Sequence, residues 1–436
     1  MNKKDIKNKL KLINFSQSKH YLDRTIQIKP FDNYDNYLDK YVCERLSFSK
    51  YIKTKLKSKL IKDTQIDISS VLDDLYLDNA VCVIAPFYKG KPLDGYFKRV
   101  EQIDEQVLNK FNLIYLDYTD LADRKFSITK YDDNHTIIKF NSFNEKHLEY
   151  IKEIINKVKK IYIHSIHILM PDIVNYEMFD VVFNKGNKTV LDLHGVVPEE
   201  LKEFDSTERA ELAEIIEEMS INLSDKVVTM SKAMSDYYID KYNINDKFIP
   251  VSILPFNDNR IFNKGKNNEI LNVVYSGGLQ KWQNIDLIKE SVRKNIDKFN
   301  FKIFTHDSDR LKSAWSDMNS NNLIIDSKTN EEIYREYESC DFGYILRDDN
   351  VINNASCPTK SIEYISYGII PILKSDKIGD YKEFGLKYIS IDDFDNGIIP
   401  NEAERKKMIE NNHQVYMKVV EQSLNGQKDI TKFLDN

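Results

Sequence analysis

Cysteine is scarce in this sequence, with four residues among 436. They form no Cys-x-x-Cys pair and have no histidine at the spacing of zinc ligands; they are Cys43, Cys82, Cys340 and Cys357. A disulfide-stapled secreted scaffold and a structural zinc site are therefore excluded as interpretations. We expect free thiols and no bound metal.

Long hydrophobic runs are also missing. The longest are Val81 to Phe87 and Gly368 to Leu373, and both are far shorter than the roughly 20 residues that cross a bilayer. The first residues carry alternating charge in place of the apolar core of a secretory signal. These absences predict a cytoplasmic protein without a transmembrane segment.

Charge is unevenly distributed. Residues 1–62 hold sixteen lysines and arginines against six acids, a balance of +10, so the rest carries −16 of the total of −6. An acidic body argues against general nucleic-acid binding. The apolar stripe within 41–63 predicts a basic amphipathic helix. It has two interpretations, a helical layer on the first domain or peripheral contact of residues 1–62 with an anionic membrane face.

The length predicts two domains, and strands alternate with helices from residue 80 onward. Apolar runs predict strands at 80–87, 113–116, 161–168, 189–193, 226–230 and 248–254. Helical spacing predicts helices at 96–107, 145–159, after Pro171, at 207–223 and from Ser231. This order is typical of βαβ units around a parallel sheet.

The alternation begins again after an asparagine-rich segment without apolar periodicity. We expect strands at 271–275, 301–304, 323–325, 342–346 and 369–373, and helices from 284, at 308–319, 330–339, 360–367 and 402–424. The predicted domains are an extension at 1–79, a first Rossmann-like domain at 80–256, a linker at 257–270, a second Rossmann-like domain at 271–400, and a final helix at 401–436 that packs back across both.

Chemistry in such sheets belongs in the loops after the strands. Gly277 and Gly278 follow a predicted strand directly, and two glycines would let a phosphate approach the backbone closely. A plain tight turn between strand and helix is the competing interpretation. Lys281 follows in the same loop.

The most informative segment runs from Cys357 through Pro358, Thr359 and Lys360 to Glu363 and ends at Gly368. Ser356 or Cys357 can cap the helix, Pro358 suits its first turn, and its free N–H groups offer a seat for a diphosphate. Lys360 adds a positive charge. Glu363, one turn later, could take both hydroxyls of a ribose, or could be an ordinary exposed acid.

These residues resemble the retaining glycosyltransferases of the large family 4 type. The resemblance covers about 185–375 and includes Asp192-Leu193-His194-Gly195, Val227 to Ser231 and Ile345-Leu346-Arg347 besides the main segment. It implies an α/β GT-B fold, in which two Rossmann-like domains face each other across a cleft, here with a helical N-terminal extension. It also implies metal-independent transfer from a nucleotide-sugar donor with retention of configuration.

The same resemblance assigns roles to individual residues. Glu363 would bind the donor ribose, and backbone amides of Ser356, Cys357 and Thr359 would bind phosphate. Arg347 and Lys360 would neutralise the leaving diphosphate, where charge builds as the glycosidic bond breaks. His194 would lie near the donor sugar, or bond within its own loop. The catalytic set would be His194, Arg347 and Lys360, with no cofactor and no metal.

Two departures from the family pattern bear on the site. Many members have a second glutamate eight positions before Glu363, where this chain has Ala355. Many also carry an arginine and a lysine in the glycine loop, where Gly278 and Gln283 stand. We expect Lys281 and Arg347 to substitute. The adjacent acids Asp348 and Asp349 are more typical of a solvated loop than of a metal site.

On the acceptor side we expect the loop from Lys89 with Asp94 and Gly95, together with Glu199. The predicted reaction moves a hexose from a nucleotide sugar, UDP-linked by expectation, to a glycan, lipid-linked or protein-linked acceptor in surface polysaccharide synthesis. Two alternatives remain open: a nucleotide-sugar epimerase of the same fold, and a catalytically silent subunit that binds glycan or a partner.

Overall fold

The computed structural model describes residues 79–91, 95–119, 125–142, 144–169, 176–205, 207–254 and 270–436, with isolated positions between 72 and 77. The predicted basic extension, Asp94 and nearly all of the predicted linker lie outside the described residues. Within the described part, no helix has the length and apolar character needed to cross a membrane.

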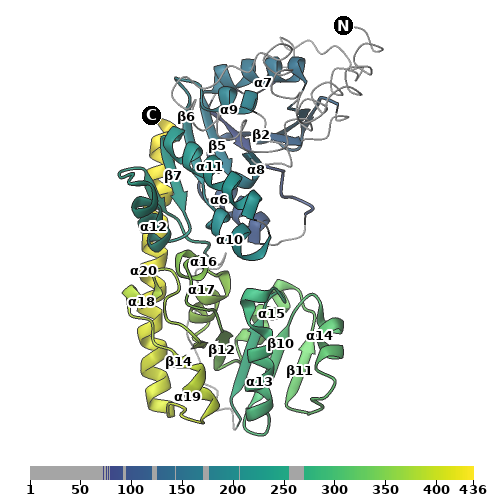
Figure 1. The fold of residues 1–436 in the computed structure, drawn as a ribbon, viewed down its shortest axis with the longest axis vertical. Coiled ribbons are helices and arrows are strands. Elements are labelled where there is room, and N and C mark those ends of the chain that lie inside the picture. The colour runs from purple at the N-terminus through teal and green to yellow at the C-terminus, as the bar shows by residue number, and fades with distance from the viewer. Residues whose placement is uncertain are drawn as a thin grey trace. The chain divides into compact units, whose positions relative to one another are not determined.

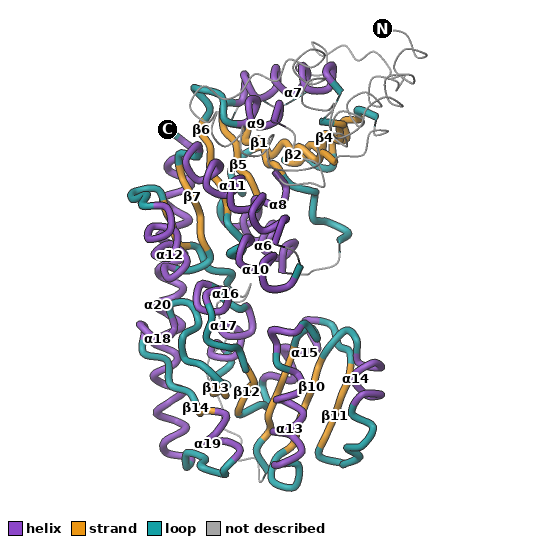
Figure 2. Tube along the Cα trace, viewed as in Figure 1, coloured by secondary structure: helices purple, strands orange, loops and turns teal. Residues whose placement is uncertain are grey.

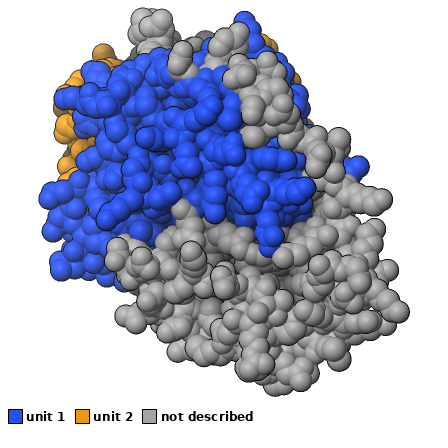
Figure 3. Space-filling view, turned by 90° about the horizontal axis from the view of Figure 1, so that it is seen from above, with its two compact units in different colours: residues 1–229, 238–249, 426–436 blue, residues 230–237, 250–425 orange. Residues whose placement is uncertain are grey.

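The chain divides into two compact units, coloured separately in Figure 3. Unit 1 holds residues up to 229, with 238–249 and 426–436; unit 2 holds 230–237 and 250–425. Figure 1 labels the helices and strands of each.

The described part of unit 1 is built on an eight-stranded sheet in the order β3-β4-β2-β1-β5-β6-β7-β8. Its strands are β1 Ala80–Ile84, β2 Asn112–Thr119, β3 Ser127–Lys130, β4 His135–Asn141, β5 Lys160–His164, β6 Lys188–Asp192, β7 Lys226–Thr229 and β8 Phe248–Pro250. The pairs from β4 to β7 are parallel, and β3 is antiparallel to β4. Every residue of β1 is buried, as its continuous apolar run predicts for a central strand.

Helices alternate with these strands along the chain (Figure 2). They are α6 Gly95–Gln106, α7 Glu145–Val158, α8 Ile166–Leu169, α9 Tyr176–Val182, α10 Val197–Phe204, α11 Thr207–Leu223 and α12 Lys232–Tyr242. The side chain of Asn144 caps α7 by accepting from backbone N–H groups of its first turn. The apolar side chains of α7 lie on one face of the helix and are buried, as their spacing in the sequence predicted.

Two expectations for unit 1 are corrected. The strand expected at 161–168 ends at His164, because Ser165 has φ of 67° and the chain turns there into α8. The hairpin of β3 and β4 was not predicted, since its short outer strand is mostly exposed and has no apolar run.

Unit 2 is built on a six-stranded parallel sheet in the order β11-β10-β9-β12-β13-β14. The strands are β9 Asn272–Ser276, β10 Asn300–Phe304, β11 Leu323–Asp326, β12 Phe342–Ile345, β13 Ile370–Leu373 and β14 Ile389–Ser390. The order reverses between β9 and β12, which defines a topological switch point of the Rossmann type.

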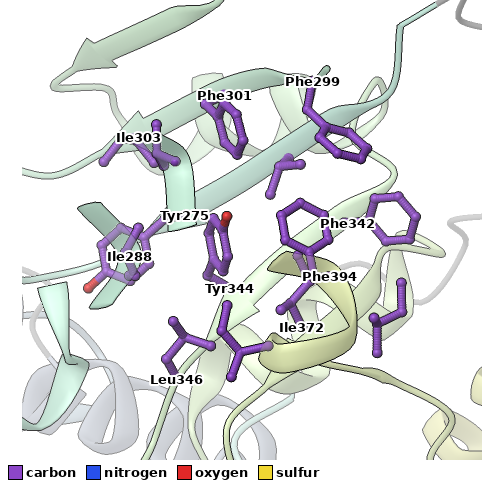
Figure 4. Close-up of a cluster of buried hydrophobic side chains, with 14 of the residues drawn as sticks. Tyr275, Ile288, Phe299, Phe301, Ile303, Phe342, Tyr344, Leu346, Ile372 and Phe394 are labelled. Carbon is purple, nitrogen blue, oxygen red and sulfur yellow. The ribbon is translucent and has the colours of Figure 1, made fainter. Parts of the chain in front are cut away.

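The helical elements of unit 2 are η1 Lys281–Gln283, α13 Ile285–Asn295, α14 Ser308–Ala314, α15 Asn330–Tyr337, α16 Val351–Ala355, α17 Thr359–Ser366, α18 Tyr381–Phe384, α19 Ile391–Asp395 and α20 Glu402–Asp435. Aromatic and branched side chains of the strands meet those of α13 and α19 in one buried core (Figure 4). Phe299, Phe342 and Tyr344 all contact Phe394 through their rings. This packing fixes the loops at the ends of β9 and β12.

The final helix, α20, runs beyond the periodic stretch expected at 402–424 and occupies almost all of the segment 401–436 that was expected to be helical. It continues past 424 to Asp435, through Gly426, because both halves bury side chains. In unit 2 Ser423 donates to the carbonyl of Ser252, and in unit 1 Thr431 donates to the carbonyl of Val107. These tertiary contacts outweigh the glycine, which costs a helix only about 1 kcal/mol.

The core predicts a steric effect at Gly343 in β12. A Cβ there would lie 2.4 Å from Cε2 of the buried Tyr364. We expect Gly343→Ala to destabilise unit 2 by about 1–3 kcal/mol through overpacking. Both tryptophans, Trp282 and Trp315, belong to unit 2, so urea unfolding followed by tryptophan fluorescence measures it.

A double-mutant cycle with Tyr364→Leu supplies the control, since the smaller side chain makes room for the added methyl group. The clash requires that Gly343→Ala costs less in that background. Equal costs in both backgrounds would rule the clash out.

Candidate functional site

The predicted site residues of unit 2 gather at the carboxyl ends of β9 and β12, where the strand order reverses. Gly277 and Gly278 follow β9, Arg347 follows β12 by two residues, and α17 begins at Thr359. Open parallel sheets bind their ligands at this location.

Gly277 allows a buried amine to approach the loop. Its φ is 153°, a conformation that favours glycine, and a Cβ there would lie 3.0 Å from Nζ of Lys360. Its N–H continues the sheet by donating to the carbonyl of Phe304. The backbone conformation therefore favours glycine at this position, and the amine of Lys360 packs against the space that a side chain would fill.

Lys360 is the central charge of the site, and only 7% of its surface is exposed. Its Nζ donates to Oε1 of Gln283 at 2.7 Å and lies 4.2 Å from the centre of the Tyr275 ring. Burial, followed by the nearby positive charge of Arg347, holds the pKa of Lys360 well below its usual range. An anion entering here would relieve both effects.

Arg347 is held by an asparagine that sequence reasoning missed. Its Nη1 donates to Oδ1 of the buried Asn353 at 3.1 Å, and Nδ2 of Asn353 donates to the carbonyl of Asp348. The backbone carbonyl of Asn353 also accepts a hydrogen bond from the hydroxyl of Ser356. No sequence motif signalled Asn353, because its role depends on α16 packing beside the end of β12.

Glu363 lies one turn into α17 and is partly exposed. The hydroxyl of Tyr334 donates to its Oε1 at 3.4 Å, and the hydroxyl of Tyr337 donates to its Oε2 at 3.3 Å. Glu363 is thus held by both carboxylate oxygens rather than being an ordinary exposed acid. The two tyrosines come from α15, which the sequence predicted as a helix without assigning it to the site.

The expected helix cap is corrected. Neither Ser356 nor Cys357 caps α17; Pro358 occupies the N-cap position and makes no side-chain capping bond. Ser356 instead ends α16, and Cys357 is buried with its Sγ 3.7 Å from the Tyr381 hydroxyl. Thr359 opens the helix, whose first backbone N–H groups have no acceptor within it.

The remaining residues near the glycine loop differ in how far their side chains are exposed. The side chain of Lys281 is exposed in η1, whereas Gln283, two residues later, is buried and holds Lys360. Asp348 and Asp349 pair with the lysines at 374 and 377, and the bond from Lys374 lowers the pKa of Asp348. The two acids therefore make ion pairs at the surface of the loop, in line with the prediction of a solvated loop.

In unit 1, His194 belongs to a buried polar cluster at the carboxyl ends of β5 and β6. Arg99 makes a bidentate pair with Asp192 through two 3.0 Å bonds, and Tyr162 also donates to Asp192. Nε2 of His194 lies 3.4 Å from Oδ2 of Asp192 and 3.3 Å from Nδ1 of His164. Burial would raise the pKa of Asp192, but Arg99 and the histidines hold it well below its usual range.

Three ligand-type atoms of this cluster, from His164, Asp192 and His194, converge within 3.3–3.5 Å of one another. Such spacing suits a small tetrahedral cation. However, Oδ2 of Asp192 already accepts from Arg99 and Tyr162, and the guanidinium charge opposes a second cation. Burial lowers the pKa of His164 to about 4, so at neutral pH the His164 ring is neutral and hydrogen-bonded within the cluster.

On the expected acceptor side, Gly95 begins α6, and Asp94 lies outside the described residues. Glu199 accepts from Nζ of Lys241 at 2.8 Å, and the same amine donates to the buried Glu217 at 3.1 Å. Burial raises the pKa of Glu217 to about 7. This network was not predicted, because its members are distant in sequence.

The chain resembles solved structures over most of its length. A sucrose-phosphate synthase from Thermosynechococcus elongatus aligns with TM-score 0.56 and 12% identity, covering 81% of this chain and 96% of its own. The E. coli trehalose-6-phosphate structure bound with UDP-2-fluoro glucose gives 0.55 and 11%, covering 81% and 98%. Anabaena HepE in complex with UDP-glucose gives 0.55 and 11%, covering 81% and 99%.

These likenesses establish the fold. The chain has the GT-B fold, an α/β architecture with two Rossmann-like domains, as the sequence resemblance implied. No protein-family model and no curated protein matches the sequence. The family 4 assignment therefore stays a prediction.

The buried Lys360 predicts a pH-dependent stability. Its folded pKa is depressed, so between that value and about 10.4 the unfolded chain binds more protons, and stability falls as the pH falls. We expect Lys360→Met to stabilise unit 2 by about 1 kcal/mol or more at neutral pH, since an apolar side chain replaces a buried amine that has lost its hydration. Urea unfolding at several pH values measures both effects. A variant that is less stable than the parent and keeps the full pH slope would contradict this account.

The Arg99–Asp192 pair predicts the opposite response to mutation. Asp192→Asn leaves a buried guanidinium without its countercharge, which costs about 3–5 kcal/mol. We expect a large fall in thermal stability by circular dichroism, and partial recovery when Arg99→Met is added. No recovery in the double variant would show that the pair does not act as a unit.

Proposed function

We propose that this protein is a retaining, metal-independent glycosyltransferase that takes a hexose from a UDP-sugar. The observation that carries the proposal is the pairing of Lys360 and Arg347 beside the open first turn of α17, at the switch point of a Rossmann sheet. Two cations and a helix N-terminus form a site for a diphosphate.

The surroundings suit the rest of a nucleotide. The glycine loop directly follows β9, and in parallel sheets of this kind the loop after such a strand lies beside the phosphates of the ligand. Glu363, in the same helix as Lys360, provides carboxylate oxygens for the ribose hydroxyls. We assign the backbone amides from Ser356 to Thr359 to the phosphate nearest the sugar.

Catalysis follows from where charge develops. As the glycosidic bond breaks, the diphosphate gains negative charge, which Lys360 and Arg347 stabilise more strongly than in the ground state. The acceptor hydroxyl attacks from the face that the diphosphate leaves, and a departing phosphate oxygen takes its proton, so configuration is retained. Positive side chains then perform the neutralisation that a metal ion provides in other transferases.

We assign His194 to the donor sugar from the first domain. Its Nε2 faces Asp192, and its ring lies 5.1 Å from that of Tyr96, so its orientation is fixed by neighbours. Gly95 at the start of α6, Asp94 before it, and Glu199 are assigned to the acceptor side. We propose a glycan, lipid-linked or protein-linked acceptor, in surface polysaccharide or glycoconjugate synthesis at the cytoplasmic face of the membrane.

The structural neighbours support the choice of donor. Two of them were solved with UDP-2-fluoro glucose and with UDP-glucose, although at 11% identity they share only the fold with this chain. An epimerase requires an acid and a base that are available to the sugar. The carboxylates of Glu199 and Glu217 both accept hydrogen bonds from Lys241, which disfavours that role for them.

Calorimetric titration with UDP tests the donor site. We expect binding by the full-length protein, and at least a tenfold loss of affinity in both Lys360→Met and Arg347→Ala, because each removes a charge-assisted contact to phosphate. Lys281→Ala, an exposed residue, should lose less. Lys294→Met, on the exposed face of α13, is the matched control and should bind UDP as the parent does.

The reaction itself is tested with UDP-hexoses. Slow release of free UDP, unaffected by EDTA, is expected of the transferase, and NMR of the product should show the anomeric configuration of the donor. Interconversion of the sugar without UDP release would indicate an epimerase. UDP binding with neither outcome across a donor panel would favour the silent subunit.

A further inference from the structure

His164 is a buried residue of unit 1 to which the proposed reaction gives no part. It is the last residue of β5 and pairs in register with Asp192, the last residue of β6. His194 follows Asp192 by two residues, and its ring centre lies 5.5 Å from that of His164. Two histidines that are 30 positions apart in the sequence therefore meet at the ends of two neighbouring strands.

The contact between the two rings joins Nδ1 of His164 to Nε2 of His194 at 3.3 Å. Oδ2 of Asp192 lies 3.5 Å from the first of these nitrogens and 3.4 Å from the second. That oxygen already accepts from Arg99 at 3.0 Å and from Tyr162 at 3.1 Å, and a carboxylate oxygen has about two acceptor positions. The two inner nitrogens therefore bond to each other, beside a carboxylate oxygen whose acceptor positions are filled.

The two rings have one proton between them. In a neutral imidazole one nitrogen carries the proton and the other is an acceptor. Burial lowers the pKa of His164 to about 4, so its ring is neutral at neutral pH. With both rings neutral, donation by Nδ1 of His164 requires the proton of His194 to be on Nδ1, and donation by Nε2 of His194 requires the proton of His164 to be on Nε2. The two rings therefore carry their protons on nitrogens of the same name.

The outer nitrogens of the pair are Nε2 of His164 and Nδ1 of His194. Both are buried, and neither has a hydrogen-bond partner among the described residues. In each arrangement one of them is a donor and the other an acceptor. Changing from the first arrangement to the second moves the inner proton from His164 to His194, while Nδ1 of His194 releases a proton and Nε2 of His164 takes one up. The inner proton stays beside the Asp192 carboxylate in both, so neither arrangement is strongly favoured.

A pair of this kind suits a hydroxyl ligand, because a hydroxyl group can both donate and accept a hydrogen bond. We propose that His164 is a positioning residue for His194: the two rings share one proton, which holds the His194 ring and sets whether its Nδ1 donates to a sugar hydroxyl or accepts from it. This inference rests on the proposed assignment of His194 to the donor sugar. His164 acts through His194 and contacts no ligand itself.

The role of His164 follows from the coupling of the two sides of an imidazole, since the hydrogen bond on one nitrogen decides what the other presents. Without His164, Nε2 of His194 is left with an Asp192 oxygen that already accepts two bonds. Asparagine at position 164 places an amide near the position of Nδ1 and can donate or accept there, whereas phenylalanine fills the space of the ring without a polar atom. These two substitutions separate the hydrogen bond from the packing.

NMR of the full-length protein with nitrogen-15 in its histidines tests the shared proton directly. Long-range proton–nitrogen spectra at about pH 8, above the ordinary histidine pKa of about 6.5, distinguish a ring nitrogen that carries a proton from one that does not. The His164→Asn and His194→Asn variants identify the signals of each ring by their loss. We expect both rings to carry the proton on the nitrogen of the same name, in equal proportion where the two arrangements exchange. Protons on Nδ1 of His164 and on Nε2 of His194, both directed at Asp192, would overturn the inference.

A double-mutant cycle on the release of UDP from UDP-hexoses tests the positioning role. We expect His164→Phe to lower kcat/KM about tenfold, the effect of one lost hydrogen bond, and His164→Asn to stay within about threefold of the parent. In the His194→Phe background, His164→Phe should have no further effect, because a residue that acts through His194 is silent without it. A full additional loss in that background, or equal losses in the Phe and Asn variants, would contradict the role.

His147→Asn is the matched control. His147 is as buried as His164 and belongs to the same unit. Its Nδ1 accepts from the backbone N–H of Asn141 at the end of β4, three places from β5 in the order of the sheet. This variant should keep the kcat/KM of the parent, and a loss equal to that of His164→Phe would show that any change to a buried histidine of unit 1 lowers activity.

The outcomes separate this inference from the function on which it rests. If no UDP-hexose is turned over, the proposed function fails, while the NMR experiment still decides whether the two rings share a proton. If UDP is released but the rings carry their protons on nitrogens of different names, the donor site of unit 2 stands and the positioning role of His164 is wrong. Thermal melting by circular dichroism shows which variants fold, and the NMR test on the parent needs no folded His164→Phe.

Discussion

The site of unit 2 depends on one buried amine that makes no hydrogen bond to a carboxylate of the described residues. Lys360 is enclosed by Gly277, the Tyr275 ring and Gln283, and within the part of the chain that the structure describes its amine donates to the neutral amide of Gln283. A desolvated cation beside a second cation is unfavourable without an anion. The packing of the surrounding strands offsets the cost of burying the Lys360 amine at this position. An anionic ligand would lower that cost by supplying the missing negative charge.

The two Rossmann-like sheets use their carboxyl edges differently. In unit 2 the positive charge of Arg347 lowers the pKa of Lys360, and neutral amides hold both side chains. In unit 1 the charge of Arg99 is cancelled by Asp192, and His164 and His194 share the same carboxylate. The first edge therefore concentrates positive charge, whereas at the second edge the charge of Arg99 is neutralised by a buried carboxylate.

Much of the architecture was readable from the sequence because it is encoded locally. The strand β1 and the helix α11 follow from apolar runs and helical periods in neighbouring residues. Predicted boundaries were wrong where tertiary structure sets the end of an element. At Ser165 a left-handed backbone conformation ends β5 earlier than predicted. At Gly426 the packing of the flanking residues keeps the glycine within α20. The hairpin of β3 and β4 could not be predicted, because the exposed edge strand β3 contains no apolar run.

For the site, the sequence alone determined that a glycine loop, Lys360 and Glu363 belong together, since their order after two predicted strands places them at one sheet edge. Only the tertiary structure decided which groups hold them: Gln283 for the amine of Lys360, Asn353 for Arg347, and two tyrosines of α15 for Glu363. The physical reason is that strand order follows from local patterns of hydrophobicity. The partner of a buried charge is chosen by proximity in space, among residues that the sequence separates by up to 77 positions.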